Sequence, residues 1–134
     1  MFVKSLDANN QKIIGERRLI RELIWINENT SEIKICAADT INESLFNWRL
    51  CINNIYNDKN RNDIYFLDVL FPKDYPFKPP KIKFVSEINN QHVDQEGNFS
   101  IAVLNNLWAP NITIEKLVPY ILDFINNNNT NNNM

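Results

Sequence analysis

The stretch that decides the fold is residues 71–84, which read FPKDYPFKPPKIKF. Four of these fourteen residues are proline, which fixes φ and has no backbone N–H to donate. A loop so dense in proline leaves the edge of a sheet without adding another strand. The next residues, 81–85, alternate charged and apolar side chains as a half-buried strand does. The segment therefore predicts a proline-rich loop that leads into a strand.

Three more strand-like segments precede this loop. Residues 32–37 alternate, residues 45–52 are rich in aromatic and β-favouring side chains, and residues 64–71 are almost continuously apolar. Turn-forming clusters at residues 39–43, 53–63 and 72–80 separate the strands. Such short connectors favour an antiparallel meander of four strands.

Helical patterns flank the strands. Residues from about 10 to 27 predict an amphipathic helix whose apolar face comprises Ile13, Ile20, Leu23 and Ile24. Residues 86–110 show little periodicity, and loops of that length in a compact domain are usually functional. We expect a second helix after Thr113, a suitable N-cap, with Pro119 kinking it or delaying its regular start. Its apolar face would comprise Ile114, Leu117, Val118, Ile121, Leu122 and Ile125. The order predicts an α+β fold with helices packed on an antiparallel sheet.

Composition narrows the class of protein. The chain has 134 residues, 44% of them hydrophobic, which fits one domain, predicted to span residues 1–125. Residues 126–134 are almost all asparagine and are expected to be a disordered tail.

The net charge of −2 without a basic stripe argues against nucleic-acid binding, and no apolar run is long enough to cross a membrane. The short apolar start does not match a signal peptide, so we expect a cytoplasmic or nuclear protein.

The two cysteines, Cys36 and Cys51, each lie in an apolar, strand-like segment. We interpret both as small buried hydrophobic residues. A disulfide would suit a secreted protein, and nothing else in the sequence indicates secretion. Neither cysteine has a CxxC or Cys/His spacing, so the sequence predicts neither a metal site nor a cofactor.

A second motif follows the proline-rich loop. Residues 97–110 read GNFSIAVLNNLWAP. With a loop of the form FPxxYPxxPPxxxF before it, this frame resembles the active-site segment of ubiquitin-conjugating enzymes (E2, or UBC, family). The resemblance covers about residues 12–125. It implies the UBC-like fold: an N-terminal helix, a four-stranded antiparallel meander, a long active-site-type loop and a second helix.

The departures from the family pattern concern catalysis. In the family, residue 100 would be the acceptor cysteine, which carries ubiquitin as a thioester, whereas this chain has Ser100. The family's His-Pro-Asn is replaced by residues 90–92, Asn-Gln-His, so His92 stands at the position of the family asparagine. The family's C-terminal helices are expected to be missing. This pattern resembles the catalytically inactive ubiquitin E2 variants, while the Trp108-x-Pro110 end is more similar to active members, including the neddylation-pathway conjugating enzyme.

Ser100 and His92 could in principle act as nucleophile and base. A serine hydroxyl is far less acidic and less nucleophilic than a thiol near neutral pH unless a dedicated base activates it. The sequence has no nucleophile elbow and no identifiable carboxylate to orient the histidine. We therefore interpret both residues as inactive. The alternative is an active ubiquitin-conjugating transferase whose cysteine was changed to serine.

A partner surface is also implied by the resemblance. In the family, positions corresponding to Phe77, Trp108, Ala109 and Pro110 contact RING and HECT ligases, and the first helix, here with Arg17 and Arg21, meets the activating enzyme or the ligase. The leading hypothesis is a non-catalytic E2 variant that binds ubiquitin, an active E2 or an E3 ligase, alone or as a heterodimer. A structural scaffold subunit without ubiquitin contact is the third alternative, because fold does not fix function.

Overall fold

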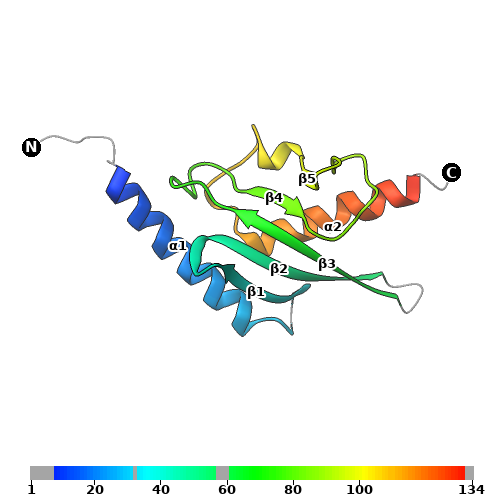
Figure 1. Cartoon of the computed structure of the whole chain (residues 1–134), viewed down its shortest axis with the longest axis horizontal. Helices are drawn as coiled ribbons and strands as arrows, with labels where there is room; N and C mark the ends of the chain where they lie inside the picture. Colours follow the sequence, from blue (N-terminus) through cyan, green and yellow to red (C-terminus); the bar gives the residue numbers. More distant parts are fainter. Residues whose placement is uncertain (1–7, 32, 57–60, 132–134) are drawn as a thin grey trace, which may run out of the picture.

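The computed structural model describes residues 8–31, 33–56 and 61–131. Its elements in chain order are α1 (Ala8–Glu28), β1 (Ile35–Ile41), β2 (Ser44–Tyr56), β3 (Arg61–Leu70), β4 (Lys81–Phe84), β5 (Asn98–Phe99), the 3-10 helix η1 (Ala102–Leu104) and α2 (Ile114–Asn131). The strands form one sheet in the order β1-β2-β3-β4-β5, with every pairing antiparallel (Figure 1). The predicted α+β meander is confirmed, with a short fifth strand inside the stretch expected to be a loop.

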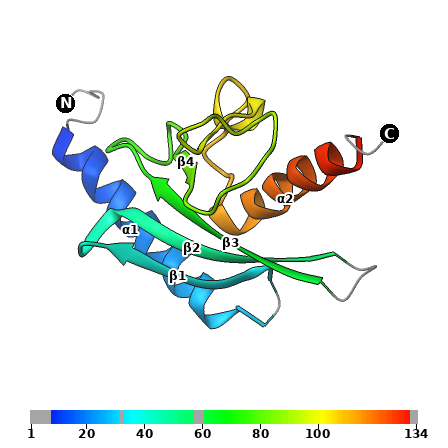
Figure 2. The same cartoon turned by 45° about the vertical axis from the view of Figure 1, so that its right-hand side comes forward.

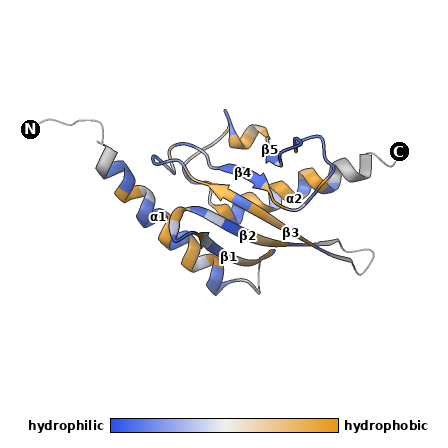
Figure 3. Ribbon diagram, in the orientation of Figure 1, coloured by the Kyte–Doolittle hydropathy of each residue, from blue (hydrophilic) through white to orange (hydrophobic). Residues whose placement is uncertain are grey.

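The sheet has one buried face and one open face, because side chains alternate along each strand. On β3, Leu67 and Val69 are fully buried, whereas Phe66 is 44% and Leu70 52% exposed. Figure 3 shows β3 as a largely hydrophobic strand, since both of its faces carry apolar side chains. The buried face forms the core with the inner sides of the two helices. Figure 2 shows α1 beside β1 and β2, and α2 beyond β3.

The hairpins differ from the sequence prediction. Strand β2 extends to Tyr56 and β3 begins at Arg61, so most of the predicted loop over residues 53–63 is strand. The first strand begins at Ile35, later than predicted, and continues to Ile41. A two-residue turn, Asn42-Glu43, then leads into β2 with φ values of 54° and 61°. Continuous backbone pairing of β2, from Asn47 to Tyr56, with the whole of β3 outweighs the low strand propensity of the asparagines there.

Helix α1 packs through a different face from the predicted one. The predicted inner residues Ile13, Ile20 and Ile24 are 45%, 46% and 52% exposed, and Leu23 is only partly buried. The fully or nearly buried side chains are Leu19, Glu22 and Ile26. Gly15 explains the orientation in part, because a Cβ there would lie 2.9 Å from the Tyr75 carbonyl oxygen. The helix therefore approaches the proline-rich loop through a position that has no side chain.

Helix α2 agrees closely with its prediction. It begins at Ile114, where the Lys116 N–H donates to Thr113 Oγ1 at 3.4 Å, and its six predicted apolar residues are all buried. Pro119 lies inside the helix and does not delay its start.

The C-terminal part of α2 reaches the asparagine-rich stretch. The helix continues to Asn131, which differs from the disorder expected from residue 126, and residues 132–134 lie outside the described residues. The side-chain amides of Asn54 and Asn126 exchange hydrogen bonds of 2.8 and 3.1 Å, which fastens α2 to β2. Within the described residues, no helix is both long and apolar enough to cross a membrane.

Candidate functional site

The segment around residue 100 is positioned by the edge of the sheet. Strand β5 pairs with β4 through Phe99 opposite Ile82, and the chain then passes through Ser100 into η1. Phe99 and Ile101 are 6% and 5% exposed, whereas Ser100 between them is exposed. Successive side chains of an extended chain point to opposite sides, so the side chain of residue 100 points toward solvent while both neighbours point into the core.

A tight turn precedes this segment. The Asp94 carboxylate accepts the N–H groups of Glu96 and Asn98, both at 2.9 Å, and the Asn98 side-chain amide at 3.1 Å. These bonds, first of all those from Asn98, lower the pKa of Asp94 below its usual 3.8. Gly97 has φ +94°, and a Cβ there would lie 2.3 Å from the Phe84 carbonyl oxygen. The turn requires glycine and sets the path of the chain into residue 100.

The Ser100 hydroxyl has one side-chain neighbour within hydrogen-bonding range among the described residues. Asn105 Nδ2 lies 3.5 Å from Ser100 Oγ and donates a shorter bond, 2.9 Å, to the Ile101 carbonyl oxygen. The backbone N–H of Ser100 donates to the His92 carbonyl oxygen at 3.0 Å. No carboxylate or imidazole in the described part of the chain bonds to the Ser100 hydroxyl. Sequence reasoning missed Asn105, whose spacing of five residues from Ser100 gave no recognisable motif.

His92 comes close to Ser100 through its backbone, but its ring is used elsewhere. The imidazole packs edge-on against Phe124 of α2, with ring centroids 4.8 Å apart, and lies 6.4 Å from the Phe99 ring. Its Nε2 atom is 3.4 Å from the Gln91 side-chain nitrogen. His92 thus packs the loop against α2, and the structure does not pair its ring with the Ser100 hydroxyl.

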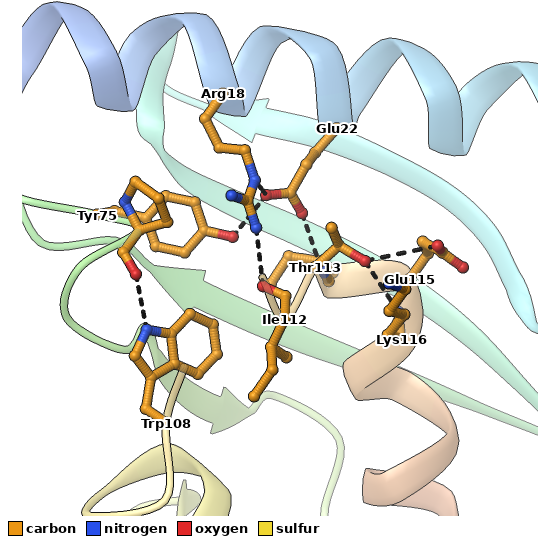
Figure 4. Close-up of polar contacts among 10 residues, drawn as sticks. Arg18, Glu22, Tyr75, Trp108, Ile112, Thr113, Glu115 and Lys116 are labelled. Carbon is orange, nitrogen blue, oxygen red and sulfur yellow. Dashed lines mark hydrogen bonds and ion pairs between the residues drawn. The ribbon is translucent and has the colours of Figure 1, made fainter. Parts of the chain in front are cut away.

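A second site joins the proline-rich loop to the loop before α2. The Trp108 indole N–H donates to the Pro76 carbonyl oxygen at 2.7 Å, and its ring lies 6.0 Å from that of Tyr75 (Figure 4). Phe77, next to Pro76, is 52% exposed. Ala109 is half-buried and Pro110 exposed. The structure therefore places four of the six predicted partner-binding residues on two loops joined by the Trp108 hydrogen bond.

Beneath these loops lies a polar junction centred on Glu22. Its Oε2 accepts the Tyr75 hydroxyl and Arg18 Nε, both at 2.6 Å, and its Oε1 accepts the Ile114 N–H at the start of α2 at 2.7 Å. Arg18 Nη2 donates to the Ile112 carbonyl oxygen at 2.9 Å. Figure 4 shows these side chains converging from α1, the proline-rich loop and the start of α2. Burial, and secondarily the Glu22 carboxylate, raises the pKa of Tyr75 well above its usual value.

The sequence contained a signal for this junction. Glu22 follows Leu19 by three residues and precedes Ile26 by four, which places it on the helix face of those two apolar residues. A carboxylate at such a position predicts a buried and hydrogen-bonded group. We did not recognise it because the isoleucines at residues 13, 20 and 24 gave a more conspicuous apolar pattern.

The two arginines predicted for partner binding are both exposed on α1. Arg21 lines a cavity of about 310 Å³ at the junction, together with Arg18, Glu22, Trp25, Thr113 and Glu115. Arg17 lies one turn earlier on the helix. Among the residues that the structure describes, no three His, Cys, Asp or Glu side chains gather into a group that could hold a metal ion.

The fold, the proline-rich loop and the segment over residues 97–110 define a ubiquitin-conjugating class of protein. Comparison with known proteins supports this assignment. A family model described as ubiquitin-conjugating enzyme matches residues 18–134. The chain therefore belongs to the ubiquitin-conjugating enzyme family, has its UBC fold, and is an E2-like protein of the ubiquitin conjugation pathway. The predicted family and fold are confirmed, and members of this family generally bind ubiquitin and E3 ligases.

Two solved structures illustrate the similarity. Human ubiquitin-conjugating enzyme E2 G1 is 28% identical with a TM-score of 0.74, and the match covers 90% of this chain and 98% of that chain. The E2 domain of a Toxoplasma gondii ubiquitin-conjugating enzyme is 27% identical with a TM-score of 0.71, and the match covers 82% of this chain and 73% of that chain.

Proposed function

We propose that this protein is a non-catalytic member of its family, a pseudoenzyme that binds an E3 ligase, ubiquitin or an active E2 and forms no thioester. The observation that carries the proposal is the hydroxyl group at residue 100, to which no basic side chain of the described residues hydrogen-bonds. A general base acts from about 3 Å of the proton it takes, or through one water. The side-chain group that does reach this hydroxyl is the Asn105 amide, whose Nδ2 lies 3.5 Å from Oγ and donates rather than accepts.

His92 does not supply the missing base. Its ring lies edge-on to Phe124, 4.8 Å between centroids, and is held there by the packing of the loop on α2. Turning the ring toward Ser100 would give up this aromatic contact. An unactivated serine hydroxyl reacts slowly, so residue 100 is a poor acceptor of ubiquitin from an activating enzyme.

The surface around Phe77 supports a binding role. An exposed aromatic side chain beside a rigid loop is a typical interface anchor. Here the loop is fixed from below, because the Trp108 indole holds the Pro76 carbonyl and the Tyr75 hydroxyl holds Glu22. By family resemblance this surface takes a RING or HECT ligase, and Arg17 and Arg21 extend it along α1.

The first experiment tests the chemistry. The protein is incubated with ubiquitin-activating enzyme, ATP and ubiquitin, and the adducts are separated by non-reducing gel and treated with reducing agent or hydroxide. We expect no adduct on the wild-type protein and slow charging of Ser100→Cys. A ubiquitin ester on Ser100 that is passed to a lysine would overturn the proposal. Rapid charging and transfer by Ser100→Cys would instead favour the active-enzyme alternative.

The second experiment tests binding. Labelled protein is titrated with ubiquitin, an active E2 and a RING domain, and the affinity of any complex is measured for Phe77→Ala and Tyr120→Ala. Tyr120 is a matched control, because it is 53% exposed on α2 and Phe77 is 52% exposed. We expect Phe77→Ala to weaken ligase binding about tenfold or more, the scale of an interface anchor, and Tyr120→Ala to leave it unchanged. Absence of binding to all three partners would favour the scaffold alternative.

A further inference from the structure

The open face of the sheet carries both cysteines, although the sequence predicted that they would be buried. Cys36 is exposed on β1 and Cys51 is half-buried on β2. Ile35 pairs with Ile52 and Ala37 with Cys51, so Cys36 is an extra residue between two consecutive pairs. The strand therefore has a β-bulge at Cys36.

The two thiols lie on the same side of the sheet. Cys36 and Ala37 are both exposed, whereas Ile35 and Ala38 on either side of them are buried. Cys51 lies between the buried Leu50 and Ile52, so its side chain also faces the open side of the sheet. Beyond the bulge, the Asn53 N–H donates to the Lys34 carbonyl oxygen at 2.8 Å, which keeps the strands paired.

The two thiols are neighbours, because Cys36 and Ala37 of the bulged strand both lie opposite Cys51 on the partner strand. Burial raises the pKa of the Cys51 thiol, and the neighbouring Cys36 thiol raises it further through charge and hydrogen bonding. A disulfide would therefore join neighbouring positions of two paired strands. A shallow cavity of about 400 Å³ gives a small molecule access to Cys51 beside Ala37, Asp39, Arg49 and Phe66.

We propose that Cys36 and Cys51 form a reversible oxidation site, in which hydrogen peroxide converts the two thiols to an intramolecular disulfide. The exposed Cys36 thiolate attacks one peroxide oxygen; the O–O bond breaks, hydroxide leaves and takes up the proton that the Cys36 thiol released, giving water, and Cys36 becomes a sulfenic acid. The Cys51 thiolate then attacks the Cys36 sulfur; the S–S bond forms, the S–O bond breaks, and hydroxide leaves as water. Two thiols and one hydrogen peroxide thus give one disulfide and two waters.

The disulfide would join the edge strand β1 covalently to β2 on the open face of the sheet. This site does not involve Ser100 or the Phe77 surface, so it is independent of the proposed function. It also differs from a structural disulfide of a secreted protein, because the thiols are accessible and their oxidation is reversible.

The test is titration of the purified full chain with hydrogen peroxide, followed by intact mass measurement, thiol counting and non-reducing peptide mapping. We expect the protein to lose two hydrogen atoms and both free thiols, to yield a peptide linked through Cys36 and Cys51, and to recover on adding dithiothreitol. The oxidised protein should melt at a higher temperature than the reduced protein.

Two variants complete the test. Cys36→Ser and Cys51→Ser each keep one thiol and should gain oxygen or form dimers, without loss of two hydrogens within one chain; circular dichroism verifies that they fold. The wild-type result alone decides the proposal. Added oxygen atoms, dimers, or two thiols that survive an excess of peroxide in the wild-type protein would each overturn it.

Discussion

The Glu22 junction and the Ser100 segment use their polar groups in opposite ways. Glu22 accepts three hydrogen bonds of 2.6 to 2.7 Å from three different parts of the chain. Ser100 is placed just as definitely by its backbone, yet among the described residues its hydroxyl has a single side-chain hydrogen bond, at 3.5 Å. The molecule thus maintains the architecture that presents Phe77 and residue 100, while the side chain at residue 100 takes no part in a polar network. This difference supports the proposed binding role.

Replacing Glu22 should have the largest effect, because it removes the acceptor of three hydrogen bonds of the junction. In Glu22→Ala, the Ile114 N–H and the Tyr75 hydroxyl lose their acceptor, and the charge of Arg18, whose side chain is 15% exposed, loses its partner. Loss of one member of a buried polar group costs about 3 kcal/mol or more of unfolding free energy. Urea denaturation measures the loss: the midpoint of unfolding should fall, while the dependence of the unfolding free energy on urea concentration stays unchanged.

The control for this variant is Glu28→Ala, which removes an exposed carboxylate from the same helix. We expect it to change the unfolding free energy by less than about 0.5 kcal/mol. If the two variants were equally stable, the junction would not be what fastens α1 to the proline-rich loop and α2.

Substitution of Gly97 tests whether the Ser100 segment is held by its backbone. In Gly97→Ala, the new Cβ would meet the Phe84 carbonyl oxygen, and the residue would have to keep φ near +94°. We expect a loss of about 2 kcal/mol of unfolding free energy, with changed NMR shifts along residues 93–100. Glu96→Ala is the control, since the Glu96 backbone, not its side chain, bonds to Asp94. A neutral effect of Gly97→Ala would show that the turn adapts.

Trp108 lies on the loop after the Ser100 segment and bonds to Pro76, next to Tyr75 of the Glu22 junction. A substitution there should cost less than the loss of Glu22. Trp108→Phe keeps an aromatic ring but removes the N–H that donates to the Pro76 carbonyl oxygen. The expected loss is about 1 kcal/mol of unfolding free energy, the net value of a typical hydrogen bond. Trp25→Phe is the matched control, because Trp25 is 41% exposed on α1. Equal stability of the two variants would contradict a fastening role for the indole.

Much of the fold could be predicted from local chemistry. The prolines of residues 71–80 specified a loop that leaves the sheet, and Thr113 with six periodic apolar residues specified α2. The exposure of Ser100 follows from its place between two buried apolar residues. In contrast, the inner face of α1 depends on Gly15 and Glu22, whose contacts are with distant segments. The helical spacing of Leu19, Glu22 and Ile26 is the one local sign of that face, and the isoleucine-rich pattern is the more conspicuous of the two.

The irregularity of β1 could not be predicted for a related reason. Residues 32–37 alternate as a regular strand does, and this alternation already directs Cys36 away from the side of the buried Ile35; the bulge at Cys36 shifts the register and exposes Ala37 as well. A bulge depends on the pairing between two strands, so the sequence of one strand does not disclose it. Similarly, the long β2–β3 hairpin arises from backbone pairing of asparagines that, taken singly, favour turns.

Acidification should loosen the turn that precedes Ser100, and this is the smallest effect we expect. The pKa of Asp94 is lower in the folded protein than its usual 3.8, because Asn98 and Glu96 donate to its carboxylate. A carboxyl group whose pKa is lowered by folding stabilises the folded state fully above the unfolded pKa. That stabilisation is lost as the pH falls through the folded pKa. The backbone amides of Glu96 and Asn98 should therefore shift in NMR spectra below pH 3.8, and Asp94→Asn should abolish the transition. If these amides titrated at the usual pKa of an aspartate, the turn would not be held by its carboxylate.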